Sequence, residues 1–252
     1  MKTLRIIFSV VERDILRSIH LKTYVFTTVR PLLFASFIFL MGRLVGPVEI
    51  NGLSMPYYKY GLIGASITLL FFTSLQAGVY LQYERAIYLE DELRTLPIAW
   101  KSLMLARVLS FVTISFISLA VYSVIVAAVI GPELVPCVLA VGTSLSVVLI
   151  PLMIVIADRC RDITVYNFIG NILEFLAVFA STVFLPIEVF PELVRPVVMY
   201  NPLSMAMSLL LAASFGVLDT EGLVLTVTYM VGLAIVVMIL SARVYGRSRN
   251  GE

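Results

Sequence analysis

The chain has 252 residues, of which 60% are hydrophobic and only 13% are charged, and its mean hydropathy is +1.02. A soluble domain of this length could not bury so much apolar surface, so the composition identifies an integral membrane protein. The formal net charge of +2 is too small to indicate a nucleic-acid partner.

The N-terminal segment predicts an amphipathic helix rather than a cleaved signal. Residues 4–19 place a row of apolar side chains on one helical face. Residues 1–30 contain no short apolar core followed by a small-residue cleavage site. We therefore expect residues 3–20 to form an interfacial helix in the headgroup plane of the membrane, with a soluble amphipathic helix as the alternative.

Six apolar segments follow, and a helix needs roughly 20 such residues to cross the hydrocarbon core. They lie at about 24–41, 60–83, 108–130, 134–157, 166–185 and 223–242. Backbone groups in lipid must be satisfied within each segment, and the alternating pattern of a barrel strand is absent from the sequence, so helices are expected. The predicted fold is all-α: one transmembrane domain over residues 1–252 with six transmembrane helices.

Lys and Arg are distributed unevenly between the loops. Fifteen of the 18 fall on the side that carries residues 1–30, the 84–107 connection, the 158–165 turn and the tail after Ala242, and three fall on the other side. Positively charged residues accumulate in cytoplasmic loops. We therefore expect a multi-pass protein of the plasma membrane with both termini in the cytoplasm.

Sequence motifs for catalysis and for nucleotide or metal binding are absent. The sequence has neither a G-x-x-x-x-G-K-[ST] loop nor an H-E-x-x-H pair, and it contains one His and two distant Cys. The loops are too short for a second domain. We therefore expect no catalytic residue, metal or cofactor in this chain, and an energy source outside it.

Two connections between the spans have distinctive sequences. The segment 84–97 is charged, compatible with a short helix, and ends at Pro97. The segment 186–204 is apolar and is interrupted by Pro186, Pro191, Pro196 and Pro202. Because Pro breaks helices, this segment can form short re-entrant helices that dip into the outer leaflet, between the fifth and sixth helices. An apolar outer loop packed on the bundle is the alternative.

These features resemble the membrane subunit of type-2 ABC exporters. In that family a Glu-Arg pair begins the first cytoplasmic loop, a Leu-x-x-x-Pro-like sequence ends it, and an Asn-Pro-Leu-Ser/Thr sequence precedes the last helices. The matching positions here are Glu84-Arg85, residues 93–97 and residues 201–204. The chain departs from the family pattern at Glu90-Asp91, where the family often has Gly-Thr.

The resemblance implies a half-transporter that dimerises with a second copy of itself or with a paralogue. It also implies a separate ABC ATPase that holds ATP and Mg, with membrane lipids around the bundle and no nucleic-acid partner. The segment 84–97 would be a coupling helix that contacts this ATPase through Glu84, Arg85, Glu92 and Arg94. A solvated loop whose charges only enforce topology is the alternative for this segment.

Two spans carry polar residues at helical spacing, so that those of each span share one face. The span 60–83 has Thr73, Gln76 and Tyr80, and the span 166–185 has Asn167, Asn171 and Glu174. Polar groups are costly in lipid, so we expect both faces to line a substrate path at the dimer axis. Interhelical hydrogen bonding that merely holds the bundle together is the alternative.

The sequence thus favours the transmembrane subunit of an ATP-driven exporter of an amphiphilic substrate, such as a drug, a lipid or a lipid-linked glycan. A stand-alone secondary transporter or channel that uses Glu174 as a proton or cation site is the alternative, although no inverted repeat is visible. An intramembrane lipid-modifying enzyme is disfavoured, because no His, Asp or Ser cluster lies near a membrane face.

Overall fold

The computed structural model describes most of the helical part of the chain. The described residues are 8–16, 29, 33, 36, 37, 40, 42, 46–50, 52–87, 89, 100–217, 224, 226 and 228–240. The expected first span, 24–41, falls largely outside them, as does part of the last, 223–242. Within the expected interfacial segment 3–20, residues 8–16 are helical.

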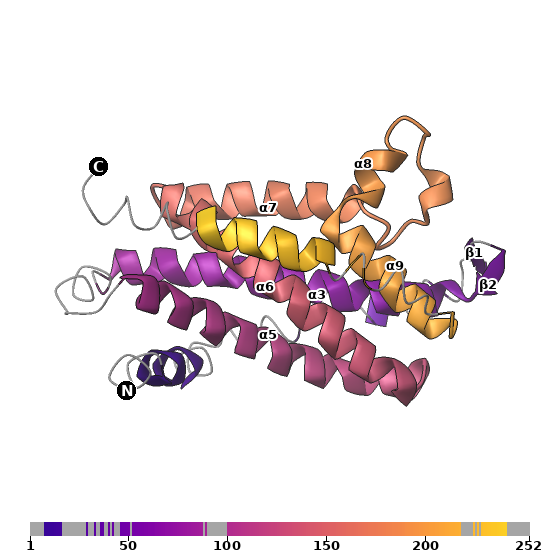
Figure 1. Cartoon of the computed structure of the whole chain (residues 1–252), viewed down its shortest axis with the longest axis horizontal. Coiled ribbons are helices and arrows are strands. Elements are labelled where there is room, and N and C mark those ends of the chain that lie inside the picture. The colour runs from indigo at the N-terminus through magenta and orange to yellow at the C-terminus, as the bar shows by residue number, and fades with distance from the viewer. Residues whose placement is uncertain are drawn as a thin grey trace.

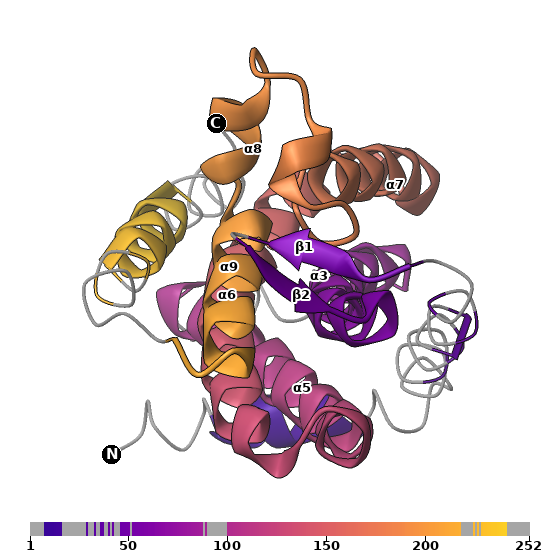
Figure 2. The ribbon, with the colours of Figure 1, turned by 90° about the vertical axis from the view of Figure 1, so that its right-hand side faces the viewer.

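Four helices run side by side along the long axis of the molecule (Figure 1): α3 (Tyr57–Ala86), α5 (Trp100–Val129), α6 (Val135–Arg159) and α7 (Ile163–Phe179). The short 3-10 helix η1 (Pro132–Leu134) joins α5 to α6. Helix α3 is central, because it packs against α5, α6, α7 and α9 (Pro202–Ser214). Figure 2 shows these helices along the bundle, with α9 in front of α6.

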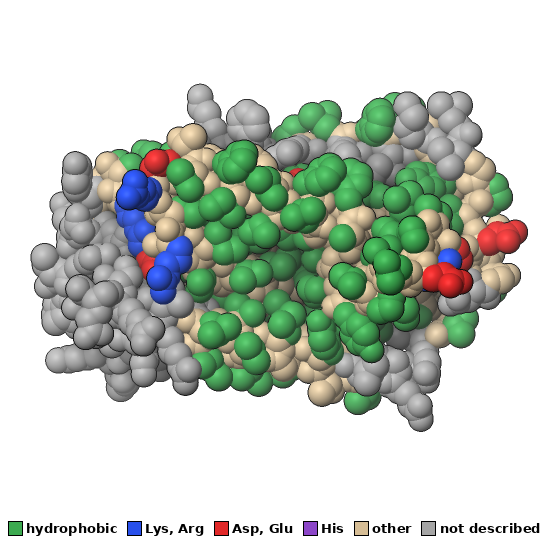
Figure 3. All heavy atoms as spheres, turned by 90° about the horizontal axis from the view of Figure 1, so that it is seen from above, with side chains coloured by type: hydrophobic (Ala, Val, Ile, Leu, Met, Phe, Trp, Pro, Cys, Tyr) green, Lys and Arg blue, Asp and Glu red, His purple; other side chains and the backbone are tan. Residues whose placement is uncertain are grey.

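Three described helices are long and apolar enough to cross a membrane: Tyr57–Ala86, Ser102–Val129 and Pro132–Arg159. They occupy the positions of the second, third and fourth expected spans. Shorter apolar helices cover Ile163–Phe179, Pro202–Ser214 and Thr228–Leu240. Charged side chains gather at the two ends of the surface in Figure 3, and hydrophobic side chains cover the face between them. This arrangement matches a helical bundle surrounded by lipid.

The described residues are mostly helical, as predicted, and a small sheet that the sequence analysis did not predict is added to the helices. Strands β1 (Val48–Ile50) and β2 (Leu53–Met55) pair antiparallel, with Ile50 opposite Leu53. Gly52, in the turn between them, has φ of 78°, a conformation that glycine adopts at no steric cost. The hairpin lies beside the start of α3, at what we call the hairpin end of the bundle (Figure 1). Residues 8–16 and the last turn of α3 lie at the opposite end.

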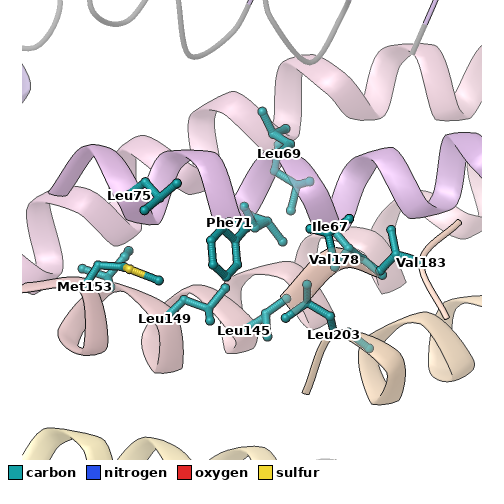
Figure 4. Packing of buried hydrophobic residues seen from close by; sticks show 14 of the residues in the cluster. Ile67, Leu69, Phe71, Leu75, Leu145, Leu149, Met153, Val178, Val183 and Leu203 are labelled. Atoms are coloured by element: carbon teal, nitrogen blue, oxygen red, sulfur yellow. The ribbon is translucent and has the colours of Figure 1, made fainter. Parts of the chain in front are cut away.

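The core lies where α3 meets α6, α7 and α9. Phe71 of α3 points toward Leu145 and Leu149 of α6, and Leu203 of α9 lies beside Leu145 (Figure 4). Many polar groups in this core bond to the backbone: the fully buried Tyr122, for example, donates to the carbonyl of Leu62 at 2.9 Å. Such pairing is required where water does not reach.

Helix α7 ends at Phe179, before the expected end of the fifth span at residue 185. The carbonyls of its last turn are satisfied from outside the helix, because the Asn201 amide donates to Ala177 at 2.9 Å and to Ala180 at 2.8 Å. The chain then forms the 3-10 helix η2 (Ile187–Val189) and the short α8 (Arg195–Met199). Helix α9 follows and runs to Ser214, beyond the expected end of the Pro-rich segment at residue 204.

Candidate functional site

A buried carboxylate joins three elements at the end of the bundle opposite the hairpin. Glu84, in the last turn of α3, is 0% exposed. Its Oε2 accepts a hydrogen bond from Arg107 Nη2 of α5 at 2.5 Å, and its Oε1 accepts one from Arg13 Nη2 at 3.2 Å. Since Arg13 belongs to the N-terminal helical residues 8–16, this one side chain links that helix, α3 and α5.

A second buried carboxylate extends the link. Asp14 is 0% exposed and accepts from Arg13 Nε at 3.0 Å, from Arg13 Nη2 at 2.7 Å and from Ser110 Oγ at 3.2 Å. Burial lowers the pKa of Arg13, but the attraction of Asp14 and Glu84 outweighs it, so the pKa lies above its ordinary value. Two guanidinium groups therefore face two carboxylates. We call Arg13, Asp14, Glu84 and Arg107 the charge network.

Apolar packing places the charge network. Val10, Leu103 and Ala106 form a small buried cluster of their own, against which Val11 and Leu89 pack. On helical spacing, Asp14 lies one turn after Val10, and Arg107 lies one turn after Leu103. The apolar contact between residues 8–16 and α5 thus brings the charged side chains together on its edge, where Asp14, Glu84 and Arg107 are shielded from water.

A second ion pair fastens α3 to α6 beside the charge network. The Arg85 guanidinium donates to the carboxylate of Asp158 and, at 3.2 Å, to its carbonyl oxygen, and the Asp158 side chain is 1% exposed. One helical turn away, the Gln82 amide donates to the carbonyls of Ala157 at 2.5 Å and Cys160 at 3.2 Å. The ends of α3 and α6 are therefore held by side chains that bond across the gap between them.

A buried ion pair adds little net stability, but it is costly to break. Removing two charges from water costs several kcal/mol per ion, which their attraction offsets only when the geometry is good. Breaking such a pair by truncating one partner leaves the other charge buried alone, which costs about 3–5 kcal/mol. The arrangement can therefore hold residues 8–16, α3 and α5 in one relative position, so that a force applied to one of them reaches the others.

The structure places only part of the expected coupling set. Glu92 and Arg94 lie outside the described residues. Glu84 and Arg85 are described, and both bond within the chain, to Arg107 and Asp158 respectively. We expected Glu84 to contact a partner subunit, but its carboxylate is buried inside this chain and is not presented to one. Glu84 lies in the last turn of α3, from which the rest of the 84–97 segment continues.

The polar stripe of α3 packs inside the chain. Thr73 is buried and accepts a hydrogen bond from Ser115 of α5 at 2.9 Å. The ring of Tyr80 packs edge-on against Phe111 of α5, with ring centroids 5.5 Å apart. Gln76 is half-buried. Two of these three residues therefore face α5, which fits the alternative that they hold helices together.

The polar stripe of α7 is placed differently. Asn167 and Asn171 are exposed on the bundle surface, and Glu174 is half-buried. Helix α7 contacts α3 through another face, where Tyr166 donates to the carbonyl of Leu75 at 2.8 Å. The structure of the single chain thus directs Thr73 and Tyr80 of α3 toward α5 and leaves Asn167 and Asn171 of α7 on the surface.

Sequence reasoning missed Arg13, Asp14, Arg107 and Asp158. Arg13 and Arg107 were counted only among the Lys and Arg that set topology, and Asp14 and Asp158 were given no role. A signal was nevertheless present. Asp14 interrupts the apolar pattern of residues 4–19 with a charge, and Arg107 directly precedes the expected span 108–130, close to the level of Glu84 in the membrane. Opposite charges at the same level of neighbouring spans are candidates for pairing.

Comparison with known proteins identifies one family. A family model described as ABC-2 type transporter matches residues 7–215, which include the charge network, α3 to α9 and the hairpin. No curated protein matches the chain.

Proposed function

The chain belongs to the ABC-2 type transporter family, and we propose that it is the membrane subunit of an ATP-driven exporter of an amphiphilic substrate. Membership makes the chain a multi-pass membrane protein and the permease component of an ABC transporter, not its catalytic domain. ATP and Mg would be held by a separate ATPase, and the permease would pair with a second copy or with a paralogue. The observation that carries the proposal is the charge network, because it joins three elements where the 84–97 segment begins.

The proposed orientation places the charge network on the cytoplasmic side of the cell membrane. The fifteen-to-three distribution of Lys and Arg supports it, since the end of α3 that carries Glu84 belongs to the richer side. Both termini, including Lys2 and Ser248, would then be cytoplasmic, whereas Asn51 and Glu192 would face outward.

Thiol labelling of intact cells tests this orientation. In a background with Cys137→Ser and Cys160→Ala, a membrane-impermeant maleimide should label a Glu192→Cys variant on sealed cells. It should label a Ser248→Cys variant only after the cells are opened. Labelling of position 248 from outside would reverse the proposed topology.

Coupling would run through the 84–97 segment. Helix α3 ends at Ala86, directly after Glu84 and Arg85, so the segment leaves from a base that is anchored to both α5 and α6. We propose that Glu92 and Arg94 contact the ATPase, while Glu84 and Arg85 transmit its movement to the bundle. Loss of one partner of a buried interfacial charge pair costs about 2–5 kcal/mol.

Two variants separate docking from transmission. Arg94→Glu should release the ATPase during co-purification. Arg85→Glu should retain the ATPase but lower transport per ATP hydrolysed, and adding Asp158→Lys should restore transport by re-forming the pair with reversed charges. If Arg85→Glu combined with Arg94→Glu leaves complex and transport intact, the segment is only a topology loop. Transport by the chain without any ATPase would instead favour a secondary transporter or channel that uses Glu174.

The substrate path would follow α7 alone, since the α3 stripe packs against α5. Asn167 and Asn171 are exposed on the single chain, and exposed amides within an apolar helix need water or a partner subunit. Glu174→Gln should preserve assembly while changing the transport rate or its pH dependence, and Glu174→Leu should damage both. An Asn171→Cys variant that no water-soluble thiol reagent reaches in any nucleotide state would mean that this face is packing surface.

The Pro-rich segment would be re-entrant on the outer side. Asn201, in the turn between α8 and α9, bonds to the carbonyls of the end of α7, and Leu203 lies beside Leu145, about 10 residues into α6 and therefore ~15 Å along it. Helix α9 also contacts η1, which lies at the hairpin end. These contacts support a chain that enters with α8, turns at Asn201 and leaves with α9.

A further inference from the structure

A cavity lies at the hairpin end, between elements far apart in the sequence. It has a volume of about 520 Å³. Its walls come from the hairpin (Ile50, Leu53), from the start of α3 (Tyr60), from η2 (Ile187, Glu188) and from α9 (Leu211). This volume is within the range of ~300–1,000 Å³ that is usual for sites of drug-sized molecules.

Three hydroxyl groups in the cavity wall, those of Tyr60, Ser204 and Ser208, form hydrogen bonds within the protein. Tyr60 donates to the carbonyl of Thr182, and Ser208 donates to the carbonyl of Met205 at 2.9 Å. The Ser204 hydroxyl accepts from the Thr182 amide at 3.0 Å. These bonds build the wall, and most other lining side chains are apolar, so the cavity offers an occupant mainly hydrophobic contact.

Glu188 is the only charged residue among the described residues that line the cavity. Its side chain is exposed, and no ion pair to it occurs within the described part of the chain. The nearby Arg195 is engaged by the backbone instead, because its Nε donates to the carbonyl of Phe190 at 2.9 Å and its Nη2 to the carbonyl of Glu188 at 3.2 Å. Arg195 thus fixes the loop that carries Glu188 through hydrogen bonds to main-chain carbonyls, not through an ion pair with the Glu188 carboxylate.

We propose that this cavity binds a lipophilic cation, with the apolar body against the hairpin, η2 and α9 and the positive charge beside the Glu188 carboxylate. Charge complementarity favours this class of occupant, since a neutral amphiphile lacks the charge–charge attraction to the carboxylate and an anionic one is repelled by it. The binding chemistry follows from the cavity itself. Only the outward position of the cavity rests on the proposed function, which places the hairpin end outside.

A size-matched pair of ions tests the proposal on the full chain in phosphatidylcholine nanodiscs, without ATPase or nucleotide. Tetraphenylphosphonium should show saturable binding above the partitioning measured with empty nanodiscs, and tetraphenylborate should not. Glu188→Gln should weaken cation binding about two- to fivefold, the range expected for a charge pair that is partly exposed to solvent. Glu192→Gln, which removes an exposed carboxylate outside the lining, should leave binding unchanged.

Filling the cavity provides an independent variant. Ala212→Phe adds a ring to a half-buried lining position and should abolish the saturable component while the protein still elutes as a single species. Equal binding of the two ions, absence of saturable cation binding, or binding that neither Glu188→Gln nor Ala212→Phe changes would each overturn the proposal. Because no ATPase is present, none of these results bears on ATP-driven export, which the coupling variants test separately.

Discussion

Removing the Glu84 carboxylate is expected to destabilise the protein by about 3–5 kcal/mol. Glu84 is 0% exposed and accepts hydrogen bonds from Arg107 at 2.5 Å and from Arg13 at 3.2 Å. In Glu84→Ala, Arg107, which is 3% exposed, would keep its charge in a place that water does not reach. Arg13 is affected less, because its side chain is 31% exposed and it retains Asp14. Most of the loss therefore comes from the isolated Arg107.

A double variant separates the energy of the pair from the cost of an isolated charge. Glu84→Gln combined with Arg107→Met removes the charge at both positions, so that neither is left buried without its partner. The new side chains have volumes similar to those they replace. We expect it to recover at least half of the stability lost in Glu84→Ala, because contacting residues show non-additive effects.

Unfolding by SDS in mixed micelles, followed by far-ultraviolet circular dichroism, measures these differences. The exposed Glu192 supplies the control, and Glu192→Gln should change stability by less than about 0.5 kcal/mol. The reasoning is refuted if Glu84→Ala behaves like this control. It is also refuted if the double variant loses as much stability as the single variants Glu84→Gln and Arg107→Met lose together, since the two side chains would then not interact.

Three other experiments test contacts between helices and the burial of Cys160. Asn201→Ala should cost about 1–2 kcal/mol in the same titration, because its amide donates to two carbonyls at the end of α7 and its oxygen accepts from the first turn of α9. Gly64→Ala should destabilise the protein, since the new Cβ would lie 2.1 Å from a backbone carbonyl oxygen. Gly232→Ala is the control, because a Cβ at that position would have no atom within 4 Å. Equal effects of the two substitutions on stability would contradict the close contact at Gly64. Burial and a neighbouring carboxylate raise the pKa of the Cys160 thiol. N-ethylmaleimide should therefore label Cys160 more slowly than Cys137 at neutral pH. The labelling rate of Cys160 should keep rising above pH 8.5, which is about the ordinary pKa of a thiol. Equal labelling of both thiols would show that Cys160 is accessible.

The hairpin shows that a strong local signal was overlooked. Residues 51 and 52 are Asn-Gly, the pair most typical of a two-residue hairpin turn, and β-branched or apolar residues flank it. The apolar runs on either side directed attention to membrane spans. The hairpin matters for the proposed binding site, because its residues Ile50 and Leu53 line the cavity at the hairpin end.

The coupling role of Glu84 stays a prediction, but the structure gives this residue surroundings that the sequence did not indicate. The sequence places Glu84 at the end of a span, where a charge is usually solvated or available to a partner. The fold buries it, because residues 8–16 cover this part of α3 and α5 and bring Arg13 to it from 71 positions earlier in the chain. A pattern of charges along one segment contains no information about a helix that packs on it from elsewhere.

The sequence by itself indicated a membrane environment and a helical fold, and it predicted the direction of the spans, because these depend on local quantities: the length of an apolar run and the number of Lys and Arg beside it. The tertiary structure alone decided which polar groups meet. Helices α3 and α5 are apolar on most sides, so their sequences leave the rotation of each helix about its axis undetermined. That rotation is decided by close contacts such as the one between Gly78 and Tyr166, where a Cβ would lie 2.2 Å from the tyrosine hydroxyl oxygen. It turns Thr73 and Tyr80 toward α5 rather than toward a shared path.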